Sequence, residues 1–290
     1  MFDARYHALS LVAVFLALIV GLLLGVAIGD AGLVSGAEKS LRKTLRGDVR
    51  QAQRERDTAR DQVALGLRYQ RESYPLLVTG RLTDRRVGLL FLGKSSASLA
   101  SDVRDALTDS GGKLTGTLAL KVPADLGALA GAAGPTRYTD LERTPALLEP
   151  FARRIGAQLI APGGKLLRRE KQVLFPTRAG AIGPFDVVVV VRLPPTIEDA
   201  TQRATTATLE DGIVRGMTES GAVAVGVEPT ATSPSSVSWF RARNLATVDD
   251  MGDIAGAAAL VFALGGAQGS FGTGPLASSL LPDVASITPR

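Results

Sequence analysis

A single uninterrupted apolar segment near the N-terminus limits most strongly what this chain can fold into. From Ala8 to Ile28 the sequence has no charged residue, and Ser10 is its only polar side chain. As a helix that rises ~1.5 Å per residue, this segment is ~31 Å long, which matches the hydrocarbon core of a bilayer. The sequence therefore predicts a short flank over residues 1–7 and a transmembrane helix over residues 8–29.

Two alternatives to a permanent span stay open. The apolar region of a secretory signal peptide is only ~7–15 residues long, so this segment is longer than a signal requires. The small-x-small pattern Ala27-Ile28-Gly29 nevertheless fits a cleavage site. A helix buried in a protein core would also be apolar on all sides. A retained span accounts best for the length.

Small residues recur at every fourth position of the apolar segment. In lipid, such residues let two helix backbones approach closely, although Gly and Ala are also common in membrane helices generally. The regular spacing predicts a surface that pairs two spans, and we name it the small-residue ridge. Its members are Ala13, Ala17, Gly21, Gly25 and Gly29.

The charges that flank the span leave its orientation open. Arg5 precedes the apolar segment, and Lys39, Arg42, Lys43 and Arg46 follow it. A positive-inside count would keep the larger part of the chain in the cytoplasm. These four charges begin about ten residues beyond the span, however, and long domains translocate largely regardless of charge.

The next segment has the composition of a long exposed helix. Residues 38–74 contain no Pro and only two Gly, and apolar residues recur at spacings of three, four or seven. Because Arg56 interrupts this stripe, we expect the helix to gain stability by pairing with a second copy. We predict a helical coiled-coil stalk over residues 34–74, ended by Pro75, since proline disfavours helical geometry in the residue before it. The stalk seam consists of Leu41, Leu45, Val49, Ala52, Ala59, Val63 and Leu67.

The stalk also accounts for most of the chain's net positive charge. Residues 38–72 include ten Lys or Arg and six Asp or Glu, a net charge of +4 out of +5 for the whole chain. The basic balance therefore predicts no nucleic-acid partner. A solvated helix surface explains the charges, and contact with an anionic lipid or polymer near the membrane is the alternative.

Beyond residue 84, short apolar runs alternate with helix-like stretches. The runs lack polar alternation, so we expect strands that are buried on both faces. Their alternation with helices favours an α/β domain with a doubly wound, mostly parallel sheet over residues 84–265, followed by a Gly-rich tail over residues 266–290. The expected strands cover 87–92, 114–120, 185–191, 222–227 and 244–248, the expected helices 98–110, 139–155, 197–220 and 253–264, and the expected loops 127–137 and 229–236.

Two motifs in this domain resemble ligand sites. GLLFLGKS at 88–95 matches the phosphate-binding pattern G-x-x-x-x-G-K-[ST], but four of its loop positions are large apolar residues that belong in a strand. We expect a strand that ends in a polar turn. Asp249, Asp250 and Asp253 could ligate a hard metal ion. We expect them instead to satisfy the N-terminus of the 253–264 helix.

The available side chains argue against an enzyme. The chain has no Cys, and its only histidine, His7, precedes the span. Nucleophilic sites of the Ser-His-Asp and Cys-His types are therefore excluded from the folded domain, as are thiolate metal sites. We assign no catalytic residues and no cofactor-binding residues, and the ligands of any metal remain unknown.

Two stretches resemble the actinobacterial MctB copper transporter family. The first is FDARYHALSLVAVFLAL at 2–18, with its Arg-Tyr-His, Ser-Leu and Ala-Val-Phe-Leu-Ala-Leu elements. The second is VDDMGDIAG at 248–256, followed by ALVFAL at 259–264, the Gly-rich 269–272 and LLP at 280–282. The order of span, stalk, α/β domain and Gly-rich end is also similar to that of the family. One departure is Met251-Gly252-Asp253, where the family has Asp-Thr after the acidic pair.

The resemblance implies an envelope protein whose large domain lies outside the cytoplasmic membrane and which has a role in copper efflux or homeostasis. It supplies no residue-level copper site, so copper enters as a ligand through the resemblance alone. Cu(I) prefers thiolate and thioether ligands, then imidazole, and this chain offers one His and the methionines Met1, Met217 and Met251. The residues by themselves favour a non-catalytic scaffold or regulator of the cell-envelope or cell-division machinery. It would be a homodimer through span and stalk that binds an envelope protein partner.

Overall fold

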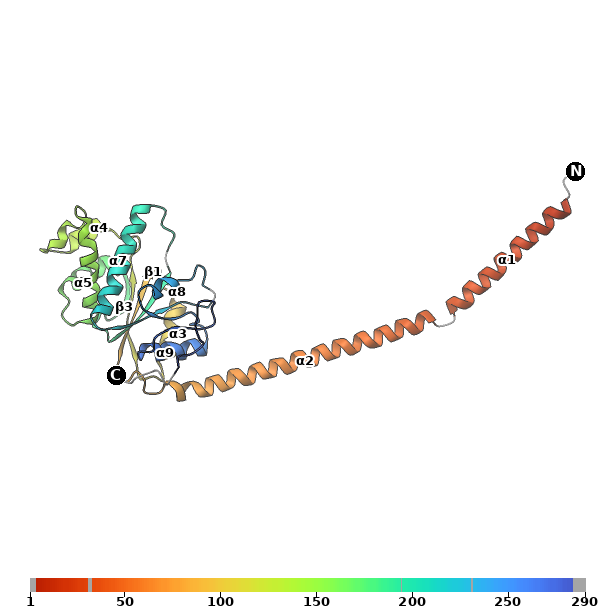
Figure 1. Ribbon diagram of the computed structural model, residues 1–290, viewed down its shortest axis with the longest axis horizontal. Coiled ribbons are helices and arrows are strands. Elements are labelled where there is room, and N and C mark those ends of the chain that lie inside the picture. The colour runs from red at the N-terminus through yellow and green to blue at the C-terminus, as the bar shows by residue number, and fades with distance from the viewer. Residues whose placement is uncertain (1–3, 31–32, 194, 231, 284–290) are drawn as a thin grey trace. The chain divides into compact units, whose positions relative to one another are not determined.

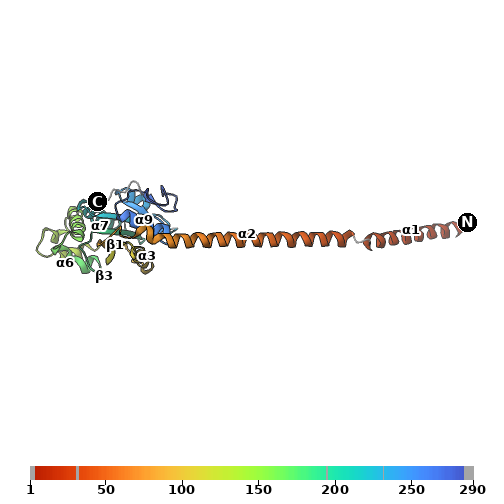
Figure 2. The same ribbon diagram turned by 90° about the horizontal axis from the view of Figure 1, so that it is seen from below.

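A computed structural model describes residues 4–30, 33–193, 195–230 and 232–283. The chain divides into two compact units, Met1–Arg68 and Tyr69–Arg290. The first unit contains α1 (Ala4–Asp30) and most of α2 (Leu33–Val78). The second contains the end of α2 and an α/β fold (Figures 1 and 2).

α1 confirms the predicted N-terminal apolar helix. Residues Tyr6–Gly29 are long and apolar enough to cross a membrane, and none of this segment is buried by the rest of the chain. An apolar helix that is exposed on all sides has no stable place in water. Its surroundings are therefore expected to be lipid or a partner helix.

α2 continues past the predicted end of the stalk. Pro75 lies inside the helix, which ends at Val78 instead of Tyr74, so the predicted stop at proline is wrong. Pro75 has no N–H, but its carbonyl accepts from Thr79 N at 2.9 Å, which completes the last turn. The Tyr74 hydroxyl donates to the Ala106 carbonyl at 2.6 Å in α3 (Ala97–Leu107). This tertiary contact holds the end of α2 in helical form against the local preference.

Within the described residues, the second unit is built on a seven-stranded sheet of order β3-β2-β1-β4-β5-β6-β7. Neighbouring strands are parallel except β2 and β3, which are antiparallel. All five expected strands are present, whereas β3 and β7 were not predicted. The strands are β1 (Arg86–Gly93), β2 (Lys113–Leu120), β3 (Thr177–Gly180), β4 (Val187–Leu193), β5 (Val223–Val227), β6 (Ala246–Val248) and β7 (Ser270–Phe271).

Helices cover both faces of this sheet (Figure 1). In β1, Leu89 and Phe91 pack with α3 and α9, and Leu90 and Leu92 pack with the helices of the opposite face. The uninterrupted apolar runs are thus strands buried on both faces, as predicted. The remaining helices are α4 (Leu126–Ala132), α5 (Leu148–Ile160), α6 (Lys165–Leu174), α7 (Ala200–Glu219), α8 (Val237–Arg241) and α9 (Ile254–Leu264).

Two connections differ from the prediction. The stretch 127–137, expected to be a loop, begins within α4, whose N-cap Asp125 accepts from Ala128 N at 2.9 Å. The helix expected over 139–155 is broken into two 3₁₀ turns before α5. Pro145 begins the second of these turns, a position where its missing N–H leaves no hydrogen bond unmade.

Candidate functional site

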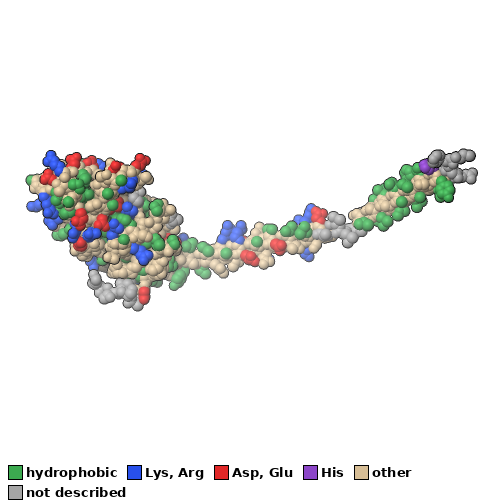
Figure 3. Space-filling model, turned by 45° about the horizontal axis from the view of Figure 1, so that its top comes forward, with side chains coloured by type: hydrophobic (Ala, Val, Ile, Leu, Met, Phe, Trp, Pro, Cys, Tyr) green, Lys and Arg blue, Asp and Glu red, His purple; other side chains and the backbone are tan. Residues whose placement is uncertain are grey.

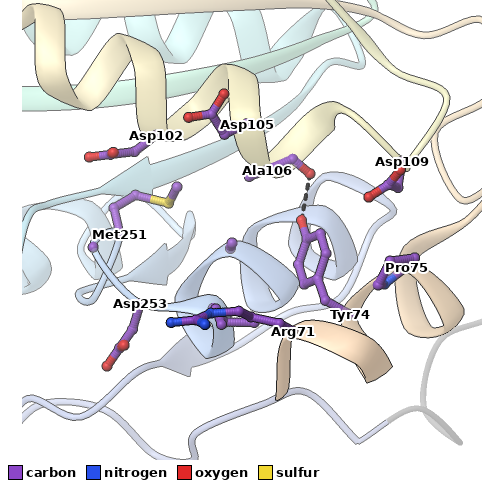
Figure 4. Close-up of a pocket in the computed structure, with 12 residues that line it drawn as sticks. Arg71, Tyr74, Pro75, Asp102, Asp105, Ala106, Asp109, Met251 and Asp253 are labelled. Atoms are coloured by element: carbon purple, nitrogen blue, oxygen red, sulfur yellow. Dashed lines mark hydrogen bonds between the residues drawn. The ribbon is translucent and has the colours of Figure 1, made fainter. Parts of the chain in front are cut away.

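The end of α2, α3 and the start of α9 together enclose a groove in the second unit (Figure 4). Its volume is about 290 Å³. Its apolar part includes Tyr74, Ala106 and Met251, of which the last two are almost fully buried. The charged side chains that line it are Arg71, Asp102, Asp105, Asp109 and Asp253.

Tyr74 fixes one wall of the groove. It is half-buried, and its hydroxyl donates to the Ala106 carbonyl (dashed in Figure 4). Burial raises the pKa of Tyr74 above its ordinary value, and the negative charge of Asp109 raises it further. The phenol therefore stays neutral around pH 7, which suits a structural hydrogen-bond donor and not an acid or a base in a reaction.

The groove is a negative region on a positively charged chain. Among the described residues, Asp102, Asp105 and Asp109 form no ion pair, and Arg71 is the single cation in the lining. Four carboxylates beside one guanidinium favour a positively charged group of a ligand or partner. The described part of the chain holds no group of three or more His, Cys, Asp or Glu placed to bind a metal ion.

The acidic motif that follows β6 has a different role from the predicted one. Asp253 occupies the N-cap position of α9, but its side chain makes no capping hydrogen bond. Asp250 is buried and accepts from Thr230 Oγ1 at 2.5 Å and Thr273 Oγ1 at 2.9 Å. Asp249 accepts from Gly274 N at 3.3 Å. Asp253 therefore has the predicted place at the helix N-terminus without the predicted hydrogen bond, and the two preceding carboxylates, Asp249 and Asp250, bind the Gly-rich segment instead.

The phosphate-loop pattern is a strand, as expected. Gly88 lies inside β1, and a Cβ atom there would overlap the ring of Phe185. Gly93 ends the strand with a φ of +117°, which favours glycine. Packing and a turn explain these two glycines without a nucleotide.

The predicted pairing surfaces are exposed in the single chain. A Cβ atom at Gly21, Gly25 or Gly29 would meet no atom within 4 Å, and Ala13 and Ala17 are also exposed. Along the stalk seam, Ala52 and Ala59 are exposed, and the exposed fractions are 60% for Leu41, 54% for Leu45, 55% for Val49, 62% for Val63 and 37% for Leu67. Pairing at both surfaces stays a prediction.

The side chains suited to Cu(I) are not brought together. Met217 and Met251 are 0% and 2% exposed, and they belong to opposite faces of the sheet. His7 is exposed on α1 in the other unit, and Met1 lies outside the described residues.

Comparison with known proteins gives one family. The family model described as "Copper transport outer membrane protein, MctB" matches residues 1–124 and 166–282. The matched residues include α1, α2, all seven strands of the sheet and every wall of the groove, and they omit α4, both 3₁₀ turns and α5. No curated protein matches the chain.

Proposed function

Because the chain belongs to the MctB copper transport family, we propose that it serves copper efflux as an anchored component of the cell envelope. α1 anchors the chain in the membrane, and the second unit lies on the extracytoplasmic side. The second unit acts as a non-catalytic binding module.

The exposed stalk seam is the observation that carries the mechanism. Leu45, Val49 and Val63 are each more than half exposed. Because burial of apolar surface stabilises a protein by ~25 cal/mol per Å², covering these side chains with a partner would be favourable. A second copy of α2 covers these side chains in a coiled coil, and the small-residue ridge lets the two spans approach each other. The working form in this proposal is a homodimer.

Copper in this proposal is handled with a partner and not by this chain alone. The thioethers of Met217 and Met251 are buried apart, and Cu(I) prefers sulfur ligands that act together. The groove offers carboxylates and an apolar floor, which suit a cationic segment of an envelope protein better than Cu(I).

Cellular copper content tests the proposal. Deleting the gene in its host is expected to raise cellular copper content. Reintroducing the wild-type gene is expected to return the copper content to its original level. The variant Leu45→Asp/Val49→Asp places two carboxylates on the stalk seam. It is expected to leave the copper content at the raised level of the deletion strain. Leu65→Asp, which adds one carboxylate away from the seam, is the control, since Leu65 is 68% exposed and lies half a turn from Val63. Unchanged copper content after deletion would contradict the proposal.

Cu(I) titration of the purified full chain against a chromophoric chelator separates indirect from direct action. We expect no binding tighter than micromolar. Tight stoichiometric binding would instead make the chain itself a copper carrier.

A scaffold with no part in copper transport is the second candidate, and the same exposed seam favours it. In that case deletion leaves copper content unchanged. Affinity capture with the full chain would then enrich an envelope or cell-division protein that the Leu45→Asp/Val49→Asp variant does not capture.

A further inference from the structure

The first half of α2 gathers its positive charges on one side. Lys39, Lys43, Arg46 and Arg50 follow each other at spacings of four, three and four, so they project from the same face at 3.6 residues per turn. Two further cations flank this row. We name the set the basic ridge: Lys39, Arg42, Lys43, Arg46, Arg50 and Arg54, all exposed.

Acidic side chains in this part of α2 leave the basic ridge largely unneutralised. Asp48 is two residues from both Arg46 and Arg50, which places it about half a turn away. Glu38 pairs with Arg42 at 2.6 Å, and Glu55 accepts from Gln51 Nε2 at 2.9 Å. In the part of the chain that the structure describes, the other five ridge residues form no ion pair.

The basic ridge and the stalk seam lie on different sides of α2. Leu45 precedes Arg46 and Val49 precedes Arg50, so each seam residue is about 100° from the adjacent ridge residue. A second copy of α2 on the seam therefore leaves the row Lys39, Lys43, Arg46 and Arg50 in solvent, whereas Arg42, seven residues before Val49, flanks the seam. Figure 3 shows Lys and Arg side chains projecting from α2.

We propose that the basic ridge binds the anionic headgroups of the bilayer in which α1 is anchored. The candidate span ends at Gly29, ten residues before Lys39. Eight of the ten residues from Asp30 to Lys39 lie in α1 or α2, and their helical rise totals ~12 Å. Long Lys and Arg side chains, and a Debye length of about 8 Å at physiological salt, bring the first ridge charges within reach of a negatively charged surface.

Lipid phosphate suits this set of side chains. Arg guanidinium donates two parallel hydrogen bonds to a phosphate group, and Lys adds point charges that need no fixed geometry. Basic clusters next to a membrane span attract anionic lipid, and each Lys or Arg near the surface adds to the binding free energy. The proposal needs no copper and no partner protein, so it goes beyond the proposed function.

Energy transfer in vesicles tests the basic ridge. Because the chain has no cysteine, Gln53→Cys gives a single fluorophore site, seven residues from Arg46 and thus on the ridge side. The labelled full chain is reconstituted into phosphatidylcholine vesicles, with or without phosphatidylglycerol, that contain an acceptor-labelled lipid. We expect higher transfer with phosphatidylglycerol, and loss of the difference at about 1 M salt, where the Debye length is about 3 Å.

A matched pair of variants separates local from overall charge. Lys43→Gln/Arg46→Gln is expected to lose the phosphatidylglycerol-dependent transfer. Lys165→Gln/Arg168→Gln makes the same charge change on exposed residues of α6 and is expected to keep it. Equal transfer in the two vesicle types, or equal loss in both variants, would overturn the proposal.

A third arm distinguishes lipid from a soluble anionic polymer. Inorganic polyphosphate is added to labelled chain in phosphatidylcholine vesicles. Binding of polyphosphate without any response to phosphatidylglycerol would overturn the proposal and assign the ridge to a polymer. The stalk-seam variants keep all six ridge residues, so a negative result here leaves the proposed function standing.

Discussion

Glu170 is a carboxylate in a position that offers it no hydrogen bond. It lies in α6 and is 0% exposed, and neither oxygen has a partner among the described residues. Burial raises the pKa of Glu170 to about 7, because an ionised carboxylate loses its hydration there. The folded chain therefore keeps this group protonated in mildly acidic solution.

We expect Glu170 to make stability depend on pH. Its ordinary pKa of 4.5 in the unfolded chain is lower than its folded pKa, so between about pH 4.5 and pH 7 only the unfolded state has lost the proton. The free energy of unfolding then falls by about 1.4 kcal/mol per pH unit. Stability from this group is complete below pH 4.5 and gone once the pH passes 7.

Glu170→Gln is expected to remove that slope and to raise the melting temperature at pH 8 above that of the wild type. Thermal unfolding of the full chain in detergent, recorded from pH 4 to pH 8, measures both effects. Parallel pH profiles for the two proteins would show that Glu170 is not the cause.

At the scale of elements, α5 and α7 pack so closely that two glycines of α7 touch the α5 backbone. A Cβ atom at Gly216 would overlap the carbonyl oxygen of Arg153, and one at Gly212 would overlap the Ala152 side chain. Glycine in a helix interior is otherwise unfavourable by ~1 kcal/mol relative to Ala. Close approach of the two helices explains why the sequence places glycine there.

Gly216→Ala is therefore expected to destabilise the chain by ~1–3 kcal/mol, despite the gain in helix propensity. Gly131→Ala in α4 is the matched control, since a Cβ atom there meets nothing within 4 Å. It is expected to be neutral or to stabilise by up to ~1 kcal/mol. Urea unfolding of the full chain measures both, and equal effects would refute the packing argument.

The stalk seam gives a second prediction at this scale. Val49→Asp/Val63→Asp puts two carboxylates on the surface that is proposed to pair. We therefore expect a weaker dimer, which dissociates at a higher protein concentration than the wild-type dimer does. Light scattering of the full chain in detergent, over a dilution series, measures the monomer fraction. Leu65→Asp is expected to leave the series unchanged, and a wild-type chain that is monomeric throughout would refute pairing.

For the whole molecule, the sequence predicted best what burial alone determines. Runs such as VVVVV in β4 are buried on both faces, so their composition reveals them. β3 is a polar edge strand and β7 has two residues, and each joins the sheet by backbone pairing, which leaves little mark in composition. The groove was missed because its lining comes from three distant segments, around Tyr74, Asp105 and Asp253. Pro75 predicts a helix end that the structure does not have, because the hydrogen bond from Tyr74 to Ala106 outweighs the local preference of the residue before proline.

The Gly-rich end of the chain is part of the fold and not a separate tail. Residues 266–290 read as a tail, yet β7 pairs with β6, and Thr273 and Gly274 donate to the buried pair Asp250 and Asp249. A Cβ atom at Gly272 would overlap Asp249 Oδ1, so the backbone is packed against the carboxylate. Composition predicts a tail at these positions, whereas the fold uses glycine there for close approach; residues 284–290 lie outside the described part of the chain.

A chain truncated after Gly265 is therefore expected to lose cooperative unfolding, because β7 goes and two buried carboxylates lose donors that the fold supplies. Thr273→Val keeps the chain length and removes one donor, so it should destabilise by ~1–3 kcal/mol. Calorimetry of both proteins in detergent measures this. If the truncated chain melted cooperatively at the wild-type temperature, the segment would be a dispensable tail after all, and the hydrogen bonds to Asp249 and Asp250 would contribute nothing to stability. A smaller loss for Thr273→Val than for the truncation is required as well, because β7 contributes backbone pairing that the point variant retains.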